Sequence, residues 1–321
     1  MQIYRSLAEL GSSSSTSVVT VGNFDGVHRG HQMVIASLLE QARVHRSRAC
    51  AVTFHPHPAQ VLHPGAPLRL ITPLEEKLGL LAETGLDSVL VLPFTEDLRR
   101  WTALHFARQV LHLGMHAIEV HEGENFRFGY QAESDVAGLA EMGRMLGFAV
   151  RAYVPRIARG APISSSRIRA AIAAGRMQEA RALLGRPFSV ISTPAPGRGY
   201  GAKYAVPTIN LAPYADLLPA HGVYVTTLRI GAERIFTGVT NVGNRPTFGA
   251  DSFAVESHLL DYEPVDLDET TPLQLTFLHR LRAERRFASP EALRDQIRVD
   301  VQRATRYFAL ATALGRPMLP R

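Results

Sequence analysis

The chain has 321 residues, of which 46% are hydrophobic and 20% charged, so it can bury an ordinary core and is long enough for two domains. A single cysteine, Cys50, excludes a disulfide framework and favours the cytoplasm. No apolar run of about 18 residues appears, and the N-terminus lacks the order of a signal peptide, so neither a membrane span nor export is expected. The formal charge of +6 suits anionic partners such as nucleotides, nucleic acid or acidic lipid headgroups, and the absence of a basic run of six residues favours small phosphorylated ligands.

From residue 17 to about residue 185, short apolar runs alternate with amphipathic segments of helical period. This order predicts βα units around a parallel sheet, in which ligands bind beyond the carboxyl ends of the strands. We expect strands at 17–21, 49–54, 87–94, 116–123 and 148–154. We expect helices at 30–45, 73–85 and 102–114, one that ends near Gly147 and one that begins at Ser164 or Ser165.

After Pro187 the pattern changes to strands with turn residues and no helices between them. The expected strands are 223–230, 234–243, 253–262 and 273–281, and one helix at about 290–313 closes the chain. This order predicts an antiparallel β-barrel or sandwich. We place the domain boundary near 185–187, which gives domains of residues 1–185 and 186–321.

The first loop of the parallel half reads GNFDGVHRGH (22–31), a glycine-rich turn followed by His28 and His31 at a helix start. A helix N-terminus offers free N–H groups to an anion, and two histidines three apart point the same way. They can donate hydrogen bonds to phosphate as charge builds in a displacement. A zinc site, with His55 or His57 as a third ligand, and a purely structural pair are the alternatives. The loop residues expected around phosphate are Gly22, Asn23, Phe24, Asp25 and Gly26.

Other segments of this half carry polar and aromatic candidates. The segment ISSSRIR (163–169) sets hydroxyls and guanidinium groups at a helix start, which suits polyphosphate, although a serine there can be a plain N-cap. Its candidates are Ser164, Ser165, Ser166, Arg167 and Arg169. In GENFRFG (123–129), Asn125 can bind phosphate or cap its own loop. The rings of Phe54, Phe126 and Phe128 can face a flat ligand or belong to the core.

In the second half, Thr208 and Asn210 lie two residues apart in an extended segment, so their oxygens project to one side and suit Mg²⁺ that carries nucleotide phosphates. An ordinary turn is the alternative. Glu256 lies mid-strand; a carboxylate there is solvated or, if it faces a pocket, can accept a proton from a hydroxyl.

The sequence resembles the bacterial bifunctional riboflavin kinase/FMN adenylyltransferase (FAD synthetase) family. GNFDGVHRGH resembles the HxGH signature of its nucleotidyltransferase half, and FHPHP (54–58), GENFRFG and ISSSRIR follow in the family's order. VPTINL (206–211), TNVGNRPTFG with AVESHLLDY, and FLHRLRAERRFASPEAL resemble its riboflavin kinase half and closing segment. Seven such motifs in order make the resemblance specific over nearly the whole chain.

The resemblance implies a Rossmann-like adenylyltransferase domain over 1–185 and a riboflavin kinase barrel over 186–321. It implies that ISSSRIR and the first loop hold ATP phosphates, and that His28 and His31 are catalytic. It places Phe54, His57, Pro58, Asn125 and Phe128 beside the flavin. In the kinase half it implies ATP and Mg²⁺ at the glycine-rich loop, with Glu256 as base for the riboflavin 5′-hydroxyl. The residues expected around that ATP and Mg²⁺ are Gly197, Gly199, Thr208 and Asn210.

The kinase loop departs from the family pattern, because Ala202 stands where arginine is expected and Ala205 where glycine is expected. The function expected is therefore riboflavin to FMN and FMN to FAD, with ATP and Mg²⁺. The alternative is an FMN adenylyltransferase whose C-terminal domain binds flavin with weak or no kinase activity. A nucleic-acid-binding barrel is a third reading, disfavoured because lysines are few and do not interleave with aromatic residues. We expect a cytoplasmic monomer or weak homo-oligomer.

Overall fold

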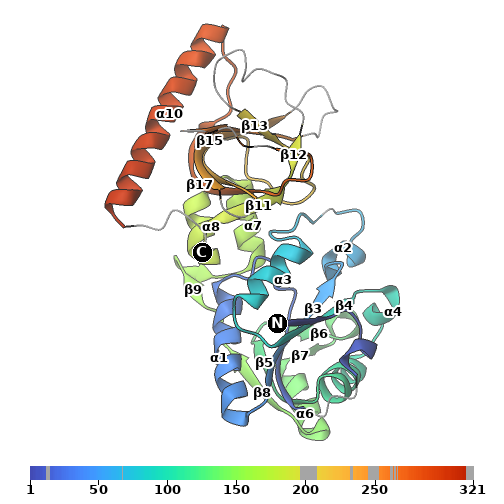
Figure 1. Cartoon of the computed structure of the whole chain (residues 1–321). Helices are drawn as coiled ribbons and strands as arrows, with labels where there is room; N and C mark the ends of the chain where they lie inside the picture. Colours follow the sequence, from blue (N-terminus) through green and yellow to red (C-terminus); the bar gives the residue numbers. More distant parts are fainter. Residues whose placement is uncertain are drawn as a thin grey trace. The chain divides into compact units, whose positions relative to one another are not determined.

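A computed structural model of the chain describes residues 1–11, 15–66, 68–195, 208–231, 234–244, 253–260, 263, 265 and 267–315. The chain divides into two compact units, Met1–Ser165 and Ser166–Arg321. Figure 1 colours them from blue to green and from green to red. This division, after Ser165, falls before the boundary expected near 185–187. The two helices between residues 165 and 185 group with the β-rich unit. The domain limits 1–185 and 186–321 stay a prediction.

The first unit is built on a parallel sheet whose strand order is β1-β4-β3-β2-β5-β8. The strands β2 and β4 are rich in buried apolar residues because both faces of the sheet are covered. The predicted strands are confirmed, and the three-residue β1, too short to show a period, adds an unpredicted edge strand. The strands are β1 (Gln2–Tyr4), β2 (Ser17–Val21), β3 (Arg48–His55), β4 (Ser88–Pro93), β5 (Ala117–Gly123) and β8 (Ala149–Tyr153).

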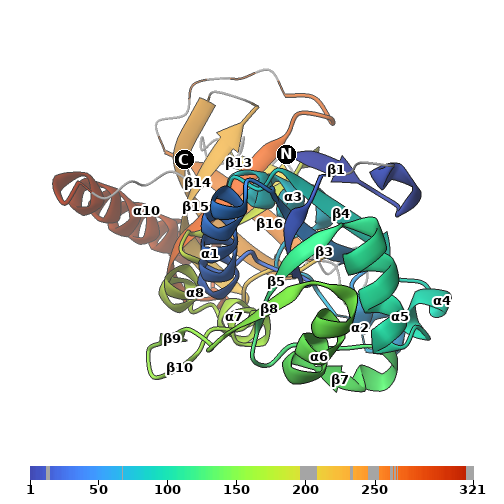
Figure 2. The same ribbon diagram turned by 90° about the horizontal axis from the view of Figure 1, so that it is seen from below.

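Helices cover both faces of this sheet, as Figure 2 shows from below. Successive strand residues alternate between two cores: Val18 packs with α1 and α3, whereas Val19 packs with the segment 103–115 and α6. The helix expected over 102–114 begins as α5 and continues as a π-helical segment (Ala107–Gly114). The helices are α1 (Arg29–His45), α2 (Pro58–Leu62), α3 (Leu74–Ala82), α4 (Glu96–Arg99), α5 (Ala103–Phe106) and α6 (Val136–Leu146).

Short segments complete the unit. Two-stranded pairs form from β6 (Arg127–Phe128) with β7 (Ser134–Asp135) and from β9 (Ile157–Ala158) with β10 (Ala161–Pro162). Turns of 3-10 helix lie at Ala8–Leu10 and Tyr130–Ala132. Gly129 turns the chain here with φ +81°, and a Cβ on it would lie 2.7 Å from the backbone nitrogen of Ala103. Glycine is therefore required where the segment GENFRFG meets α5.

The second unit holds α7 (Ser165–Ala173), α8 (Met177–Leu184) and a curled antiparallel sheet of order β11-β17-β14-β15-β16-β13-β12. Its edge strands β11 (Phe188–Ser192) and β12 (Pro194–Ala195) are separated in the chain only by Thr193. One stretch of chain thus lies at both edges, which curls the sheet toward a barrel, as predicted. The other strands are β13 (Thr208–Leu211), β14 (Gly222–Ile230), β15 (Arg234–Asn244), β16 (Phe253–Leu259) and β17 (Leu273–Ala283).

The predicted closing helix is confirmed as α10 (Pro290–Ala313). Its start is set by Ser289, whose side chain accepts a hydrogen bond from the Ala292 N–H at 3.2 Å, and by Pro290 in the first turn. Ala304 and Phe308 of α10 pack on Val223, Val225 and Val239 of the sheet.

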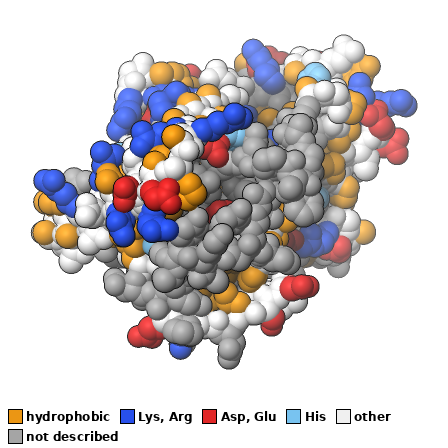
Figure 3. All heavy atoms as spheres, turned by 90° about the horizontal axis from the view of Figure 1, so that it is seen from above, with side chains coloured by type: hydrophobic (Ala, Val, Ile, Leu, Met, Phe, Trp, Pro, Cys, Tyr) orange, Lys and Arg blue, Asp and Glu red, His pale blue; other side chains and the backbone are white. Residues whose placement is uncertain are grey.

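Charged side chains of both signs are interspersed over the described atoms of the face drawn in Figure 3. Within the described residues, no helix combines the length and the apolar character needed to cross a membrane.

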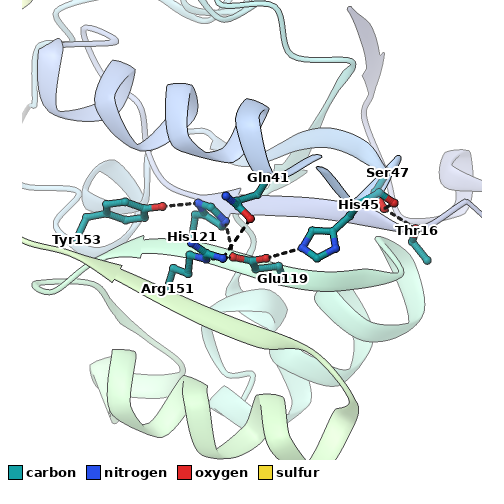
Figure 4. A network of polar contacts seen from close by, with 8 residues as sticks. All are labelled: Thr16, Gln41, His45, Ser47, Glu119, His121, Arg151 and Tyr153. Carbon is teal, nitrogen blue, oxygen red and sulfur yellow. Dashed lines mark hydrogen bonds and ion pairs between the residues drawn. The ribbon is translucent and has the colours of Figure 1, made fainter. Parts of the chain in front are cut away.

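A buried polar network ties α1 to β5 and β8 (Figure 4). The Glu119 carboxylate, 4% exposed, lies 3.1 Å from Nε2 of both His45 and His121 and also pairs with Arg151. The Nδ1 of His121 lies 2.8 Å from the hydroxyl of Tyr153. Burial lowers the pKa of His121 despite the neighbouring Glu119, so the ring is neutral, donates from Nε2 and accepts at Nδ1.

We expect Glu119→Ala to lower the free energy of unfolding of the first unit by roughly 1–3 kcal/mol, because the fully buried His121 ring loses its acceptor. Urea unfolding followed by hydrogen exchange in β5 and β8 measures this. Glu96→Ala, which removes an exposed ion pair with Arg99, is the matched control and should change stability by less than about 0.5 kcal/mol. Equal effects of the two changes would refute a structural role for the network.

Candidate active sites

The first candidate site lies where the parallel sheet splits. β2 and β5 are neighbours, but their pairing ends at Val19 and Val120, so the last residues of the two strands diverge. The chain order on the two sides of this split reverses, which makes it the switch point at which ligands bind in such sheets. The loop 22–28 follows β2 and the segment 124–126 follows β5. Both loops therefore lie at the carboxyl edge of the sheet, where the sequence pattern predicts that ligands bind.

His28 is the N-cap of α1, and its ring accepts a hydrogen bond from the backbone N–H of His31 at Nδ1, over 3.3 Å. In a neutral ring this acceptor role leaves the proton on Nε2, so His28 can donate from that atom. Gly30 makes the arrangement possible, since a Cβ there would lie 3.1 Å from the His28 ring. The signature H-x-G-H is thus a helix cap with its tautomer fixed by the backbone.

The two rings stack, with centroids 3.6 Å apart and planes 13° from parallel, and the Phe24 ring meets His31 edge-on at 5.1 Å. The pKa of His31 lies well below its ordinary value because the ring is buried and because His28 and Lys77 are near. His31 is therefore neutral. Among the described residues, its buried Nδ1 has no hydrogen-bond partner. A buried polar atom without a partner is unusual, and a ligand oxygen or water would satisfy it.

The loop before these histidines is held by hydrogen bonds to residues 71 and 72, which lie outside the loop. The Asp25 carboxylate accepts hydrogen bonds from the backbone of Ile71 at 2.9 Å and of Thr72 at 3.1 Å, and the hydroxyl of Thr72 accepts one from Gly26 at 3.0 Å. Phe24 and Val27 adopt positive φ angles of 49° and 36°. Such angles cost about 1–3 kcal/mol each in residues with a side chain, so the anchors hold the loop in a strained form. Contact between Asp25 and phosphate stays a prediction, since its carboxylate serves as such an anchor.

The segment ISSSRIR is divided between the two units. Ser165 starts α7, as predicted, and its hydroxyl donates to the carbonyl of Asp25 at 2.9 Å, within the first unit. In the second unit, Arg167 pairs with Glu179 of α8 at 3.3 Å, and Arg169 lies 3.5 Å from the hydroxyl of Ser166. The roles predicted for Ser164, Ser166, Arg167 and Arg169 at phosphate stay predictions.

Aromatic rings gather at the carboxyl ends of β3, β4 and β5. Phe54 meets Phe94 edge-on at 5.8 Å and lies 6.3 Å from Phe106, and Phe128 lies 6.0 Å from the same Phe106. Phe126 stacks on Phe128 at 5.2 Å. The structure thus brings together Phe54 and Phe128, which are far apart in the sequence, and it leaves both only partly buried. Such a cluster can receive the face of a flat aromatic ring.

The other residues predicted near a flavin have visible local roles. His57 caps α2, with its Nδ1 accepting from the backbone of Ala59 at 3.1 Å, and Pro58 is the first residue of that helix. Asn125 is exposed in the turn after β5. Among the described residues, no group of three or more His, Cys, Asp and Glu side chains is arranged to hold a metal, so the zinc alternative has no ligand set there.

The second candidate site is a row of polar residues on the curled sheet. Asn210 on β13 lies opposite Glu256 on β16, and Glu256 lies opposite Asn241 on β15. Residues paired in this way share a face, with Cβ atoms about 5 Å apart. Thr208 belongs to the same face, since it lies two residues before Asn210. The predicted cluster of Thr208, Asn210 and Glu256 is therefore brought together, and its oxygens suit Mg²⁺.

Several predictions about the second site fall outside the described residues. They concern the glycine-rich loop with Gly197 and Gly199, and the departures at Ala202 and Ala205.

Two family models match this chain, one over each half. A family model described as FAD synthetase matches residues 11–167, and one described as riboflavin kinase matches residues 184–308. A curated relative from Pseudomonas fluorescens, named bifunctional riboflavin kinase/FMN adenylyltransferase, is 36% identical over 99% of this chain and 99% of its own. A protein of the same name from Escherichia coli K12 is 34% identical over 97% and 99%. The chain belongs to this bifunctional family.

A solved structure titled "Macrolide-efflux Protein" from Streptococcus pneumoniae has the same fold, with a TM-score of 0.83, 28% identity, and coverage of 94% of this chain and 97% of that one. The macrolide efflux named in that title is said of the Streptococcus protein, and the likeness concerns the fold alone.

Beside the candidate site in the family's adenylyltransferase half, sequence reasoning missed two buried charged residues. Lys77 of α3 and Glu122 of β5 are 6% and 3% exposed. The local sequence pattern predicts a helix around Lys77 and a strand around Glu122, and gives no sign that either residue lies at a site. The one sequence signal that could have found them is a charged residue on the face that the hydrophobic periodicity assigns to the core. In the kinase half, sequence reasoning missed Asn241, which only the strand register places beside Glu256.

Glu122 fills the split in the sheet. Because β5 has diverged, the N–H of Val21 has no strand partner on that side, and Oε1 of Glu122 accepts it at 2.5 Å. Burial raises the pKa of Glu122 well above its ordinary value, against the opposing hydrogen bond from Val21, so the carboxyl favours its neutral form. Glu122 therefore fixes the end of β2 directly before Gly22, in surroundings that disfavour its charged form.

We expect Glu122→Gln, which keeps a carbonyl acceptor without a titrating proton, to retain the fold, and Glu122→Ala to lose roughly 1–3 kcal/mol of stability through the unpaired Val21 N–H. The native pKa is raised, so wild-type stability is full below the ordinary value of 4.5 and declines as pH rises above it. The Gln variant lacks this decline. Urea unfolding from pH 4 to pH 8 compares them, and parallel stability curves would contradict the assignment.

Proposed function

We propose that this chain makes FAD from riboflavin in two steps, with riboflavin phosphorylated in the C-terminal unit and FMN adenylylated in the N-terminal unit. Family membership over both halves supports the pair of reactions. The observation that carries the assignment of the first site is the stacked pair His28–His31, with a neutral His31, at the switch point of the parallel sheet.

In the adenylyl transfer, a phosphate oxygen of FMN attacks the α-phosphorus of ATP and pyrophosphate leaves. The attacking oxygen is already anionic, so no general base is needed, and catalysis consists of positioning and charge stabilisation. The Nε2–H of His28 and the free N–H groups at the start of α1 donate to phosphate oxygens. The aromatic cluster around Phe54 and Phe128 receives the isoalloxazine ring.

In the kinase step, the 5′-hydroxyl of riboflavin attacks the γ-phosphorus of ATP, and ADP leaves. Glu256 takes the hydroxyl proton, which its place in the polar row allows. Thr208 and Asn210 would hold Mg²⁺, and the ion would neutralise phosphate charge when bound. The shared face of these three residues favours an active kinase over a C-terminal unit that only binds flavin.

The remaining expectations accompany this proposal. The nucleotide is ATP with Mg²⁺, the reaction runs in the cytoplasm where ATP is supplied, and the partners are small molecules and no nucleic acid. We expect the chain to act as a monomer or weak homo-oligomer.

The double change His28→Ala with His31→Ala should lower the rate of FAD formation from FMN and ATP by about 10²- to 10³-fold, because hydrogen-bond donors to the developing charge are lost. FMN formation from riboflavin should stay near the wild-type rate. Chromatography of the flavin products measures both rates in one sample. Near wild-type FAD synthesis in the double variant would overturn the assignment of this site.

Glu256→Gln should lower FMN formation by about 10²- to 10⁴-fold, the usual contribution of a general base, and leave FAD formation from supplied FMN intact. Glu284→Gln, another partly exposed acid of the second unit, serves as the control. An unchanged kinase rate in Glu256→Gln would remove Glu256 as the base.

A further inference from the structure

Lys77 joins the carboxyl ends of two neighbouring strands. Its Nζ lies 3.2 Å from the carbonyl oxygen of Asn23, 3.0 Å from the hydroxyl oxygen of Thr53 and 3.4 Å from the carbonyl oxygen of Phe54. Asn23 belongs to the loop that leads to His28, whereas Phe54 lies at the end of β3 in the aromatic cluster. One ammonium group therefore connects the segment proposed for ATP phosphates with the segment proposed for flavin.

The contacts match the chemistry of an ammonium group. A protonated lysine has three N–H donors and no acceptor, and Nζ of Lys77 has three oxygen partners in two different segments. The planar guanidinium of arginine presents its donors in a fixed fork and suits two parallel acceptors better than three dispersed ones. The sequence holds 35 Lys and Arg residues, and among them only Lys77 and Lys203 are lysines.

The surroundings of Lys77 are buried and contain few charges. Two ionisable groups of neighbouring elements interact electrostatically with Lys77. Asp25, from the loop after β2, affects the pKa of Lys77, and Lys77 affects the pKa of His31 in α1. Burial lowers the pKa of Lys77 to about 8, and Asp25 opposes this. The same positive charge helps to keep the pKa of His31 low. Lys77 thus acts on the site through both contacts and charge.

We propose that Lys77 is a positioning residue of the adenylyl transfer, whose ammonium group holds the phosphate loop at Asn23 and the flavin segment at Phe54 in their relative places. The inference rests on the proposed function, since it assigns ligands to both segments. Lys77 itself does not touch the reacting atoms, because its donors are used by the protein.

A dependence on pH follows from the number of donors. Above the pKa of Lys77 the amine keeps two N–H donors and loses its charge, so it cannot serve three acceptors. Adenylyl transfer should therefore fall as pH rises through about 8, with the protonated enzyme as the active form. The riboflavin kinase reaction of the same chain has no such dependence on Lys77 and provides an internal control.

The ionisation of Lys77 can be observed without any reaction. Labelling with ¹³C-lysine gives signals from two residues only, and Lys203→Arg assigns them. We expect the Cε signal of Lys77 to titrate near pH 8, well below the ordinary value of 10.5. A Lys77 signal that titrates at the ordinary value would overturn the proposal whatever the activity of the chain.

The functional test compares kcat/KM for FAD formation between pH 6 and pH 10 in wild type, Lys77→Gln and Lys77→Arg. We expect a tenfold to hundredfold loss in Lys77→Gln, since small misplacements of reacting groups have effects of this size, and no decline near pH 8. Lys77→Arg should also lack the decline, because its charge persists, and should recover part of the activity. Kinase rates that match wild type show that the second unit is intact, and urea unfolding followed by hydrogen exchange in β2 and β3 shows whether the first unit is folded in each variant.

Two results would overturn the proposal. One is a Lys77→Gln variant that keeps the wild-type decline near pH 8, and the other is one that keeps the full rate of FAD formation at pH 7. A wild-type protein that forms no FAD from FMN and ATP would contradict the proposed function instead. The lysine titration would still decide whether the Lys77 contacts exist.

Discussion

The parallel sheet of the first unit splits between β2 and β5, and the site depends on this split. Where two parallel strands diverge, backbone groups lose their partners and must be satisfied by something else. Glu122 accepts the N–H of Val21 at that point. The loop that follows is then held by Asp25 and the ammonium group of Lys77. These anchors permit the positive φ angles of Phe24 and Val27, which bring the chain to the start of α1.

Buried ionisable groups in this unit divide into two kinds. Glu119, His121 and Tyr153 satisfy one another in a network that binds α1 to the sheet (Figure 4). Glu122 and Lys77 act on backbone groups at the ends of strands, and their surroundings move their pKa values in opposite directions, toward the neutral form of each. His31 is neutral for the same reason. The site is thus a place of low polarity in which donor positions are fixed before any ligand arrives.

The second unit reaches its site by a different route. No loop end or helix start brings Asn210, Glu256 and Asn241 together; the register of three antiparallel strands does so. Because side chains alternate along a strand, a shift of one residue would turn Glu256 to the opposite face, where Ser257 and Thr240 form a buried hydroxyl pair at 2.9 Å. The packing of Val223 and Val239 against α10 fixes the face on which the polar row lies.

Period and motif are local properties of the chain, so they predict the order of strands and helices, the parallel and antiparallel classes of the two halves, and the place of the H-x-G-H loop. The sequence also identified Thr208, Asn210 and Glu256 as candidates. The folded chain was needed to show that Lys77 and Glu122 contact the ends of β2 and β3, that Asp25 anchors a loop, and that Asn241 lies beside Glu256. These roles arise from contacts between residues distant in sequence, whose burial and partners no local pattern records.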